Sequence, residues 1–455
     1  MNSLLHHRYT QLAVLILAGG TIYPLLYLRQ NFELSLLETY QLSSTDLGQL
    51  YSLLGVIFVA TYLPSGWLAD RFSTRGLVAV SLAATGLLGL WFASVPGLWA
   101  TRVIFIGWGL ATGLTFWAAL IKSVSLIAPH DKQAGYFGWL DGGRGLVEAL
   151  LATIAVALFA HTTENLQADT ATAMRQVVLF YALIVLSVSP LALAVLRIPG
   201  DSAQPSYAEK TGAPPATAHA TLAAAPQPTP ATSDAAAAAE PSLPAALKPL
   251  LRNPRLWLAA FCIFAGYQLF WATYALSAYL QQELAMTAVA AGGITVAKLW
   301  MRPIGAIGAG LLGDRIQAMP TLAGLLILGA LTLCLMAWLP SGIGETLLVA
   351  LVLMLGLASY GARGIYWASL DDCNIPAHGR GLAIGLMSLV GYLPDIFSPL
   401  TQGLLLNEEM GREGYRWYFG LTAAIALCGA GAALWLQRLV HTRELWANAG
   451  SAGYN

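Results

Sequence analysis

The sequence is built from repeated apolar runs, most of them about 20 residues long, separated by short polar segments. A helix of this length crosses the hydrocarbon core of a bilayer, and a helix satisfies its own backbone hydrogen bonds where no water is present. Six runs lie in the first part of the chain and six in the second: 11–30, 47–68, 77–98, 101–121, 135–160, 177–196, 256–280, 289–312, 322–339, 346–367, 382–406 and 419–436. The sequence therefore predicts an all-α membrane protein with twelve transmembrane helices.

The composition excludes several other classes of protein. Of the 455 residues 57% are hydrophobic and only 10% are charged, whereas a soluble domain has about 25% charged residues. Basic and acidic residues balance at 23 each, so the chain lacks the basic surface of a nucleic-acid-binding protein. No hydrolase, metalloprotease or phosphate-loop motif is present, and the four cysteines are widely spaced. We expect no enzyme activity, metal or cofactor, and a monomer in the lipid bilayer.

The two sets of runs are joined by a segment of different composition. Residues 200–249 are rich in Ala, Pro and Thr, and such a segment buries too little apolar surface to offset the entropy of ordering. The predicted division is a six-helix half at 1–199, a flexible cytoplasmic linker at 200–249, a second six-helix half at 250–440 and a cytoplasmic tail at 441–455.

The two halves also repeat each other in sequence. GLAT at 109–112 recurs as GLAS at 356–359, an offset of 247 residues (356 − 109). GWLADR at 66–71 recurs as GLLGDR at 310–315. Such repeats are typical of transporters built from duplicated bundles, so we expect two pseudo-symmetric six-helix bundles.

The loop charges predict the orientation in an inner membrane. Basic residues mark one side: Arg71, Arg75, Lys132, Arg252, Arg255, Arg315, Arg380, Arg438 and Arg443. Acidic residues mark the other: Glu164, Asp169, Glu345, Glu408 and Glu409. The main basic exceptions on that side are Arg175, Arg412 and Arg416. By the positive-inside rule both termini and the linker are expected in the cytoplasm.

The loop GWLADRFSTR after the second run resembles the signature of the major facilitator superfamily, with Ser73 where that signature has glycine. The resemblance implies a twelve-helix transporter in which this loop and its repeat at 310–315 brace the two halves. The gating residues that it indicates are Gly66, Asp70, Arg71, Arg75, Asp314 and Arg315. Other segments, such as GGTIY and VGYLPD, are similar to a sparsely characterised branch of bacterial permeases.

A second resemblance concerns the first apolar run. YLRQNFEL at 27–34 is similar to the first-helix stretch of organophosphate:phosphate antiporters, which implies that Arg29 contacts a substrate phosphate. The alternative is that Arg29 anchors the helix at the membrane interface, because the polar residues that follow it can end the span there. That family has a second arginine on its seventh helix, where this chain has Tyr267, Gln268 and Trp271. We expect Tyr27, Gln268 and Trp271 to line the solute site.

Charged residues also lie within the apolar runs, where each costs about 2.5–3.5 kcal/mol on insertion scales unless it has a partner or a wet cavity. Asp141, Arg144 and Glu148 share one helical face because they are three and four residues apart. The alternative to a functional role is an Arg144–Glu148 pair that only fixes helix packing.

Further charges follow in the second half. Arg302 precedes Asp314 by twelve positions, about 18 Å of helix, which places it near the midplane. Lys298, one turn earlier, is expected to extend toward the interface. Arg363 lies beside Tyr366 and Trp367, so a cation–π contact or a gating role competes with solute binding. Asp395 occupies the position equivalent to Glu148 (395 − 247 = 148).

We therefore predict a secondary active transporter that moves a small polar, anionic organic solute by alternating access, with possible proton coupling. The predicted solute-binding residues are Arg29, Arg144, Arg302, Arg363, Tyr27, Gln268 and Trp271, because guanidinium groups bind anions in bidentate fashion. The predicted proton-coupling residues are Asp395, Glu148 and Asp141. The alternatives are a transport-like membrane sensor and an exporter of a hydrophobic or cationic compound.

Overall fold

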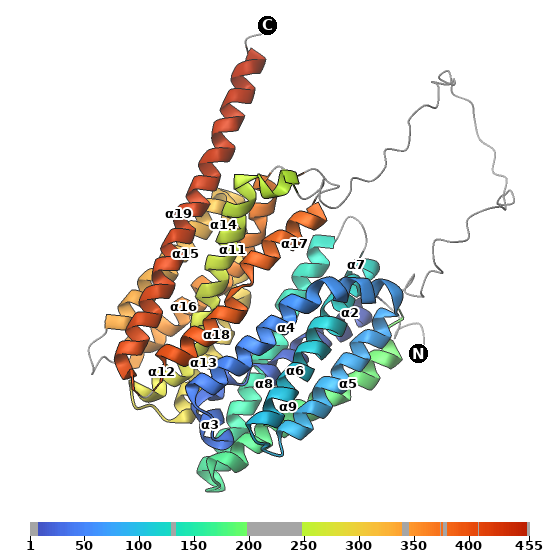
Figure 1. Cartoon of the computed structure of the whole chain (residues 1–455), viewed down its shortest axis with the longest axis vertical. Coiled ribbons are helices and arrows are strands. Elements are labelled where there is room, and N and C mark those ends of the chain that lie inside the picture. The colour runs from blue at the N-terminus through green and yellow to red at the C-terminus, as the bar shows by residue number, and fades with distance from the viewer. Residues whose placement is uncertain are drawn as a thin grey trace, which may run out of the picture.

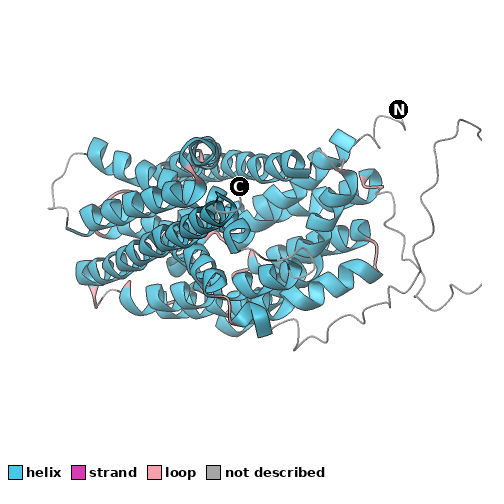
Figure 2. Cartoon of the chain, turned by 90° about the horizontal axis from the view of Figure 1, so that it is seen from above, coloured by secondary structure: helices cyan, strands magenta, loops and turns pink. Residues whose placement is uncertain are grey.

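The computed structural model describes residues 8–128, 133–197, 248–338, 345–373, 375, 380–407 and 409–452. All regular structure in these ranges is helical, joined by short loops (Figure 2). The predicted linker lies outside the described residues except for Lys248 and Pro249, which belong to a short helix at 248–251. The predicted division of the chain around this linker remains a prediction.

The first half contains six spans, of which the first is broken into two α-helices and the fourth and fifth contain π-helical segments. In order they are α2 (Arg8–Leu26) with α3 (Arg29–Tyr40), α4 (Ser44–Arg71), α5 (Thr74–Phe92), α6 (Leu98–Gly109) with η1 (Leu110–Phe116) and α7 (Trp117–Ile127), α8 (Gln133–Ala160) with η3 (His161–Asn165), and α9 (Thr170–Val195).

The second half repeats this pattern. Its spans are α11 (Pro254–Ala272) with η4 (Thr273–Ala275) and α12 (Leu276–Gln282), α13 (Ala288–Leu299) with α14 (Met301–Ile316), α15 (Ala318–Trp338), α16 (Glu345–Ile365) with η5 (Tyr366–Cys373), α17 (Arg380–Gly391) with α18 (Pro394–Leu405), and α19 (Gly411–Ala452). This is the all-α, twelve-span architecture that the apolar runs predict (Figure 1).

Several helix boundaries differ from the prediction. The first span continues from residue 30 to Tyr40, because polar residues of α3 are buried against the other half instead of facing water. The last helix continues through most of the predicted tail, to Ala452. Among the described residues nine helices are long and apolar enough to cross a membrane by themselves. The other spans are α4, α13–α14 and α17–α18, which are more polar or are broken.

Six spans return the chain to the side on which it started, so each half begins and ends at the same end of the bundle. We call this the linker end; it contains Arg8, Val195 and Pro254, and the opposite end is the far end. In Figure 1 the blue-to-green half and the yellow-to-red half lie side by side.

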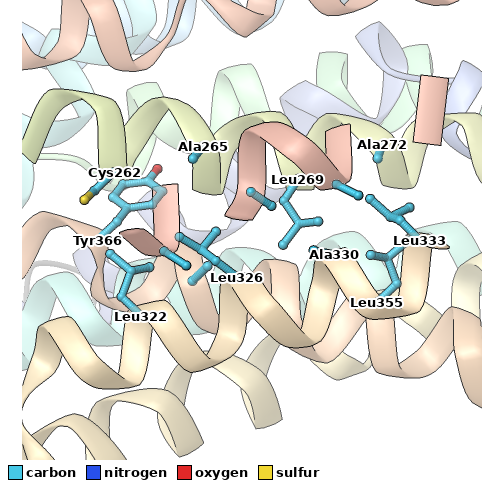
Figure 3. Packing of buried hydrophobic residues seen from close by; sticks show 14 of the residues in the cluster. Cys262, Ala265, Leu269, Ala272, Leu322, Leu326, Ala330, Leu333, Leu355 and Tyr366 are labelled. Carbon is cyan, nitrogen blue, oxygen red and sulfur yellow. The ribbon is translucent and has the colours of Figure 1, made fainter. Parts of the chain in front are cut away.

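Each half has its own apolar core. In the second half α11, α15 and α16 meet at Leu269, Leu326 and Leu355 (Figure 3). Because lipid is as apolar as these side chains, close van der Waals packing stabilises the bundle more than burial does. Gly429 shows this: a Cβ there would stand 2.3 Å from the Cβ of Ala265, so glycine lets α19 lie directly on α11.

The two halves contact each other toward the far end. Helix α4 packs on α18, where Thr45 donates a hydrogen bond to the carbonyl of Gly403 (3.0 Å). Helix α3 packs on α12, and Ser277 Oγ donates to the Asn31 carbonyl (2.9 Å). At the linker end no described atom outside the backbone of α4 and the chain neighbours of Gly66 lies within 4 Å of the place where a Cβ of Gly66 would stand. The described halves are therefore closed against each other at the far end.

This closure predicts the effect of a larger side chain at Gly48. A Cβ at this position would stand 2.4 Å from the Pro399 carbonyl oxygen, so Gly48→Leu must push α18 away from α4. We expect a loss of about 1–3 kcal/mol of stability, visible as a lower melting temperature of the purified protein. Gly420→Leu is the control, because no atom lies within 4 Å of its Cβ position. Equal melting temperatures for the two variants would contradict the close α4–α18 contact.

Candidate functional site

Arg302 joins the two halves through two ion pairs. It lies at the start of α14, directly after the break at Trp300. Its Nη1 lies 2.8 Å from Glu148 Oε2 and its Nη2 lies 2.7 Å from Asp141 Oδ1, both on α8 of the other half. The Arg302 side chain is 11% exposed, against 23% for Glu148 and 56% for Asp141. One arginine is therefore shared by two carboxylates, and the Glu148 pair is the better shielded.

Arg144 does not pair with Glu148, although the sequence spacing allowed such a pair. Its Nε donates to the Gly19 carbonyl (3.3 Å), and its guanidinium lies over the rings of Tyr23 and Trp117 (5.3 and 5.4 Å). Missing Cβ atoms explain the arrangement. The Arg144 side chain lies against Gly19, and the Arg302 side chain lies against Gly145. Arg302 thereby reaches Glu148 from the other half.

Arg363 of α16 is a half-buried cation held by aromatic rings. Its guanidinium carbon lies 4.1 Å from the Phe270 ring centre and 5.5 Å from that of Tyr267. Within the described ranges it has neither an ion pair nor a hydrogen bond. The cation–π contact expected from the sequence is present, although the rings belong to α11 and not to the sequence neighbours of Arg363.

Asp395 is a buried carboxylate without a cationic partner in the described part of the chain. It lies in the first turn of α18, where Pro394 follows the break between α17 and α18. Its Oδ1 accepts hydrogen bonds from Tyr267 Oη (2.7 Å) and Trp271 Nε1 (3.0 Å). These two donors compensate for part of the lost hydration. Its backbone lies against Gly55 of α4, so the carboxylate also lies where the halves meet.

The charged groups lie close enough to act on one another. Asp141 is within electrostatic reach of Arg302, Arg144 and Arg363, and Asp395 is within reach of Arg363. We call this set the inter-half site: Asp141, Arg144, Glu148, Arg302, Arg363 and Asp395. Formally it contains three cations and three carboxylates.

Aromatic residues surround the inter-half site. Tyr27 stacks on Tyr51 and Tyr274, with ring centres 5.8 and 5.5 Å apart, and meets the edge of Trp271 at 6.3 Å. Tyr27 and Trp271 thus lie next to Asp395, where the sequence prediction places a solute. The two residues come from the broken first and seventh spans of opposite halves.

Two predicted solute ligands, Gln268 and Arg29, already have hydrogen-bond or ion-pair partners within their own half. Gln268 is hydrogen-bonded within the second half, accepting from Ser398 Oγ (2.7 Å) and donating to Thr422 Oγ1 (3.4 Å). Arg29 is buried and pairs with Glu33 (2.8 Å), with Tyr51 beneath its guanidinium. The solute-binding roles of both remain predictions, and their present partners make each a less available ligand than Arg363.

The predicted gating residues lie at the linker end. Gly66 and Arg71 belong to the end of α4, Arg75 to the start of α5, and Asp314 and Arg315 to the end of α14. Ser73 caps α5 by accepting from the Gly76 amide (3.2 Å). Asp314 is exposed, and the side chain of Asp70 lies outside the described residues. In this structure the halves are closed at the far end, away from these residues, so their gating role remains a prediction.

Several residues at or near the site were not predicted. Trp117 and Phe270 contact arginines, yet their sequence positions look like ordinary apolar helix positions. Lys298 was expected to extend toward the interface, but it is fully buried and donates to the Thr273 carbonyl (3.3 Å). Thr273 lies where the helix changes type at η4, which the sequence did not reveal. Among the described residues no His, Cys, Asp and Glu cluster has the arrangement of a metal site.

Comparison with known proteins identifies the class. Residues 12–399 match the sequence profile of the Major Facilitator Superfamily, so the chain belongs to this family. It is 27% identical over 425 residues to the inner membrane protein YqcE of Escherichia coli (strain K12), covering 92% of each chain. It is also 26% identical over 445 residues to the inner membrane protein YihN of the same organism, covering 96% of this chain and 97% of YihN.

Solved structures share the fold at low identity. A variant of the nucleoside transporter NupG superposes with a TM-score of 0.67 at 13% identity, covering 94% of this chain and all of that one. A bacterial homologue of the human lysosomal transporter Spinster, in an inward-facing and unoccupied conformation, gives 0.67 at 14% identity, covering 97% and 98%. The protein is thus a multi-pass membrane transporter and not an enzyme, as the sequence predicted.

The Arg302–Glu148 pair predicts a specific energetic coupling. In a double-mutant cycle with Arg302→Met and Glu148→Met, we expect the pair to be coupled by about 0.5–3 kcal/mol, because Arg302→Met leaves Glu148 without its cation and Glu148→Met leaves Arg302 with Asp141 alone. The measurement is the stability of each purified variant in detergent.

The control cycle combines Arg144→Met with Glu148→Met, two changes on the same helix. Since Arg144 donates to Gly19 instead of Glu148, these changes should be coupled more weakly than the changes at Arg302 and Glu148. A larger coupling for Arg144 than for Arg302 would contradict the arrangement of the inter-half site.

Proposed function

We propose that this protein is a proton-coupled transporter of a small organic anion that binds at the inter-half site. The observation that carries the proposal is that two half-buried arginines lack an ion-pair partner in the described part of the chain. Arg144 and Arg363 lie on opposite halves, contact aromatic rings, and have no carboxylate partner among the described residues. Unpaired cations inside a membrane bundle are expensive, and an anionic solute supplies the missing charge.

Arg144 and Arg363 are the anion ligands in this proposal. A guanidinium presents a planar set of donors that matches a carboxylate or sulfonate in bidentate geometry. The aromatic contacts leave the edge of each guanidinium available for such hydrogen bonds. Because one arginine belongs to each half, a bound anion attracts both halves toward itself, which favours closure around the solute.

Arg302 has a different role, in which it holds the halves together through α8. Its ion pairs with Asp141 and Glu148 already use both terminal nitrogens. A solute anion that approaches Arg302 must compete with these carboxylates, so we assign Arg302 to the conformational change instead of to primary solute binding.

Asp395 is the proton carrier in the proposal. The inter-half site balances three guanidinium groups against three carboxylates, so its formal charge is zero. When Asp395 takes up a proton, the site has one net positive charge, and one solute anion neutralises it. Proton and anion then bind favourably together, which is the requirement for symport.

The inner membrane is the proposed location, in line with the names of the relatives YqcE and YihN. The excess of basic residues at the linker end supports cytoplasmic termini. With this orientation the far end faces the periplasm, and the arrangement described above is closed toward the periplasm.

A second candidate is a transporter of an organic cation. Asp395 lies among the rings of Tyr267, Trp271 and Tyr27, and aromatic rings with a carboxylate are a common arrangement for binding a cation. The two candidates make opposite predictions for Arg363, because its charge attracts an anion and repels a cation.

Arg363→Gln distinguishes the candidates. For an anionic solute we expect affinity to fall about 10- to 150-fold, since one charge-assisted hydrogen-bonding group is lost. The measurement is ligand-induced thermal stabilisation of the purified protein in a screen of organic anions and cations. Arg416→Gln is the matched control, because Arg416 also lies over an aromatic ring, Trp338 (5.1 Å), but outside the inter-half site. Tighter binding of a cation by Arg363→Gln would favour the second candidate.

Asp395→Asn tests the coupling. The amide keeps an acceptor for Tyr267 and Trp271 but cannot exchange a proton. In proteoliposomes we expect solute exchange to continue while accumulation driven by a pH gradient is lost. Glu148→Gln should weaken both processes, because it removes one of the two partners of Arg302. Accumulation by Asp395→Asn at the wild-type level and with the same pH dependence would exclude Asp395 as the proton carrier.

A further inference from the structure

A small internal cavity lies between the break of the first span and α8. It is lined by Tyr27, Gln30, Asn31, Phe32, Glu148 and Leu299, among others, and is about large enough for one water molecule. It borders the inter-half site at Glu148, but most of its wall belongs to the first half.

The cavity coincides with buried polar atoms that have no partner. Gln30 and Asn31 are 3% and 7% exposed, and Gln30 Nε2 and Asn31 Oδ1 form no hydrogen bond. The Tyr360 hydroxyl lies beside the Gln30 amide without acceptable hydrogen-bond geometry. Glu148 uses Oε2 for Arg302, and its side chain is 23% exposed, so its other oxygen is accessible to an additional donor. Leaving the buried amide groups of Gln30 and Asn31 unpaired is costly, so a missing ligand is the simplest explanation.

We propose that this cavity holds one ordered water molecule that connects α3 to Glu148. The water accepts a hydrogen bond from Gln30 Nε2 and donates one each to Asn31 Oδ1 and to the free oxygen of Glu148. Three such bonds are the usual number for a buried water. Glu148 then has a donor at each carboxylate oxygen, Arg302 at one and the water at the other.

The chemistry of the lining favours water over a metal cation. The site offers one donor and two acceptors, and the N–H group of Gln30 would face a cation with the wrong polarity. The volume also excludes an organic solute. A second cavity of similar size, lined by Leu25, Leu50, Phe92 and other mostly apolar residues, provides a contrast within the same half. Since an apolar void of this kind stays dry, we expect no water there.

The direct experiment is a structure of the full-length protein at a resolution that shows ordered water. The expected result is density for one water within hydrogen-bonding distance of Gln30, Asn31 and Glu148, and none in the apolar cavity. An empty polar cavity, or water in both cavities, overturns the proposal.

A stability experiment gives an independent answer. If water occupies the site, Asn31→Leu displaces it and leaves Gln30 and Glu148 unpaired, so the melting temperature should fall by several degrees. If the site is dry, the same change fills a void and removes an unpaired acceptor, and the melting temperature should stay the same or rise. The second result contradicts the proposal.

Thr39→Val is the matched control. Thr39 Oγ1 is also buried and unpartnered on α3, but Thr39 is not part of the cavity wall, so its loss should be neutral or stabilising. Should Asn31→Leu fail to fold, Gln30→Leu makes the same comparison from the other side of the cavity. Neither measurement depends on the solute or on proton coupling, so the water site and the proposed function stand or fall separately.

Discussion

The arrangement of this protein depends on how it compensates charges that lipid cannot solvate. Arg302 carries one charge into the interface between the halves and shares it between Asp141 and Glu148 of the opposite half. Breaking a buried pair of this kind leaves an uncompensated charge, which costs far more than the pair itself contributes. The pair is therefore weak evidence for overall stability, but it is strong evidence that α8 and α14 have a fixed position relative to each other.

Missing side chains make these charge contacts possible. Gly145 gives the Arg302 side chain room to lie against α8, and Gly19 does the same for Arg144. Gly48, Gly55 and Gly403 bring α4 and α18 into backbone contact at the far end. In a membrane bundle, where burial alone drives association weakly, close approach through glycine supplies the van der Waals contact that holds helices together. The same glycines therefore determine which charges can meet.

The remaining charges differ in how fully they are compensated. Arg144 and Arg363 have aromatic rings but no carboxylates, and Asp395 has two hydrogen-bond donors but no cation. Asp395 lies at the break of the eleventh span, Arg144 contacts the first span at Gly19 and Tyr23, and Arg363 contacts the seventh span at Phe270, so these incomplete environments lie against spans that are broken. A site that binds a charged solute needs such groups, whereas a site that only fixes packing does not.

The sequence by itself determined the twelve spans, the duplicated halves and most of the intramembrane charges, because the length of apolar runs and the cost of intramembrane charge are local properties of the chain. It named Tyr27 and Trp271 as residues of the solute site, and internal repetition made Asp395 the counterpart of Glu148, but it missed the burial of Lys298 and Glu33. Only the tertiary structure decided which carboxylate each arginine contacts. Helical spacing suggested Arg144 as the ion-pair partner of Glu148, yet the partner is Arg302, 154 positions away in the chain. Arg302 reaches Glu148 across the interface because Gly145 has no side chain in its path.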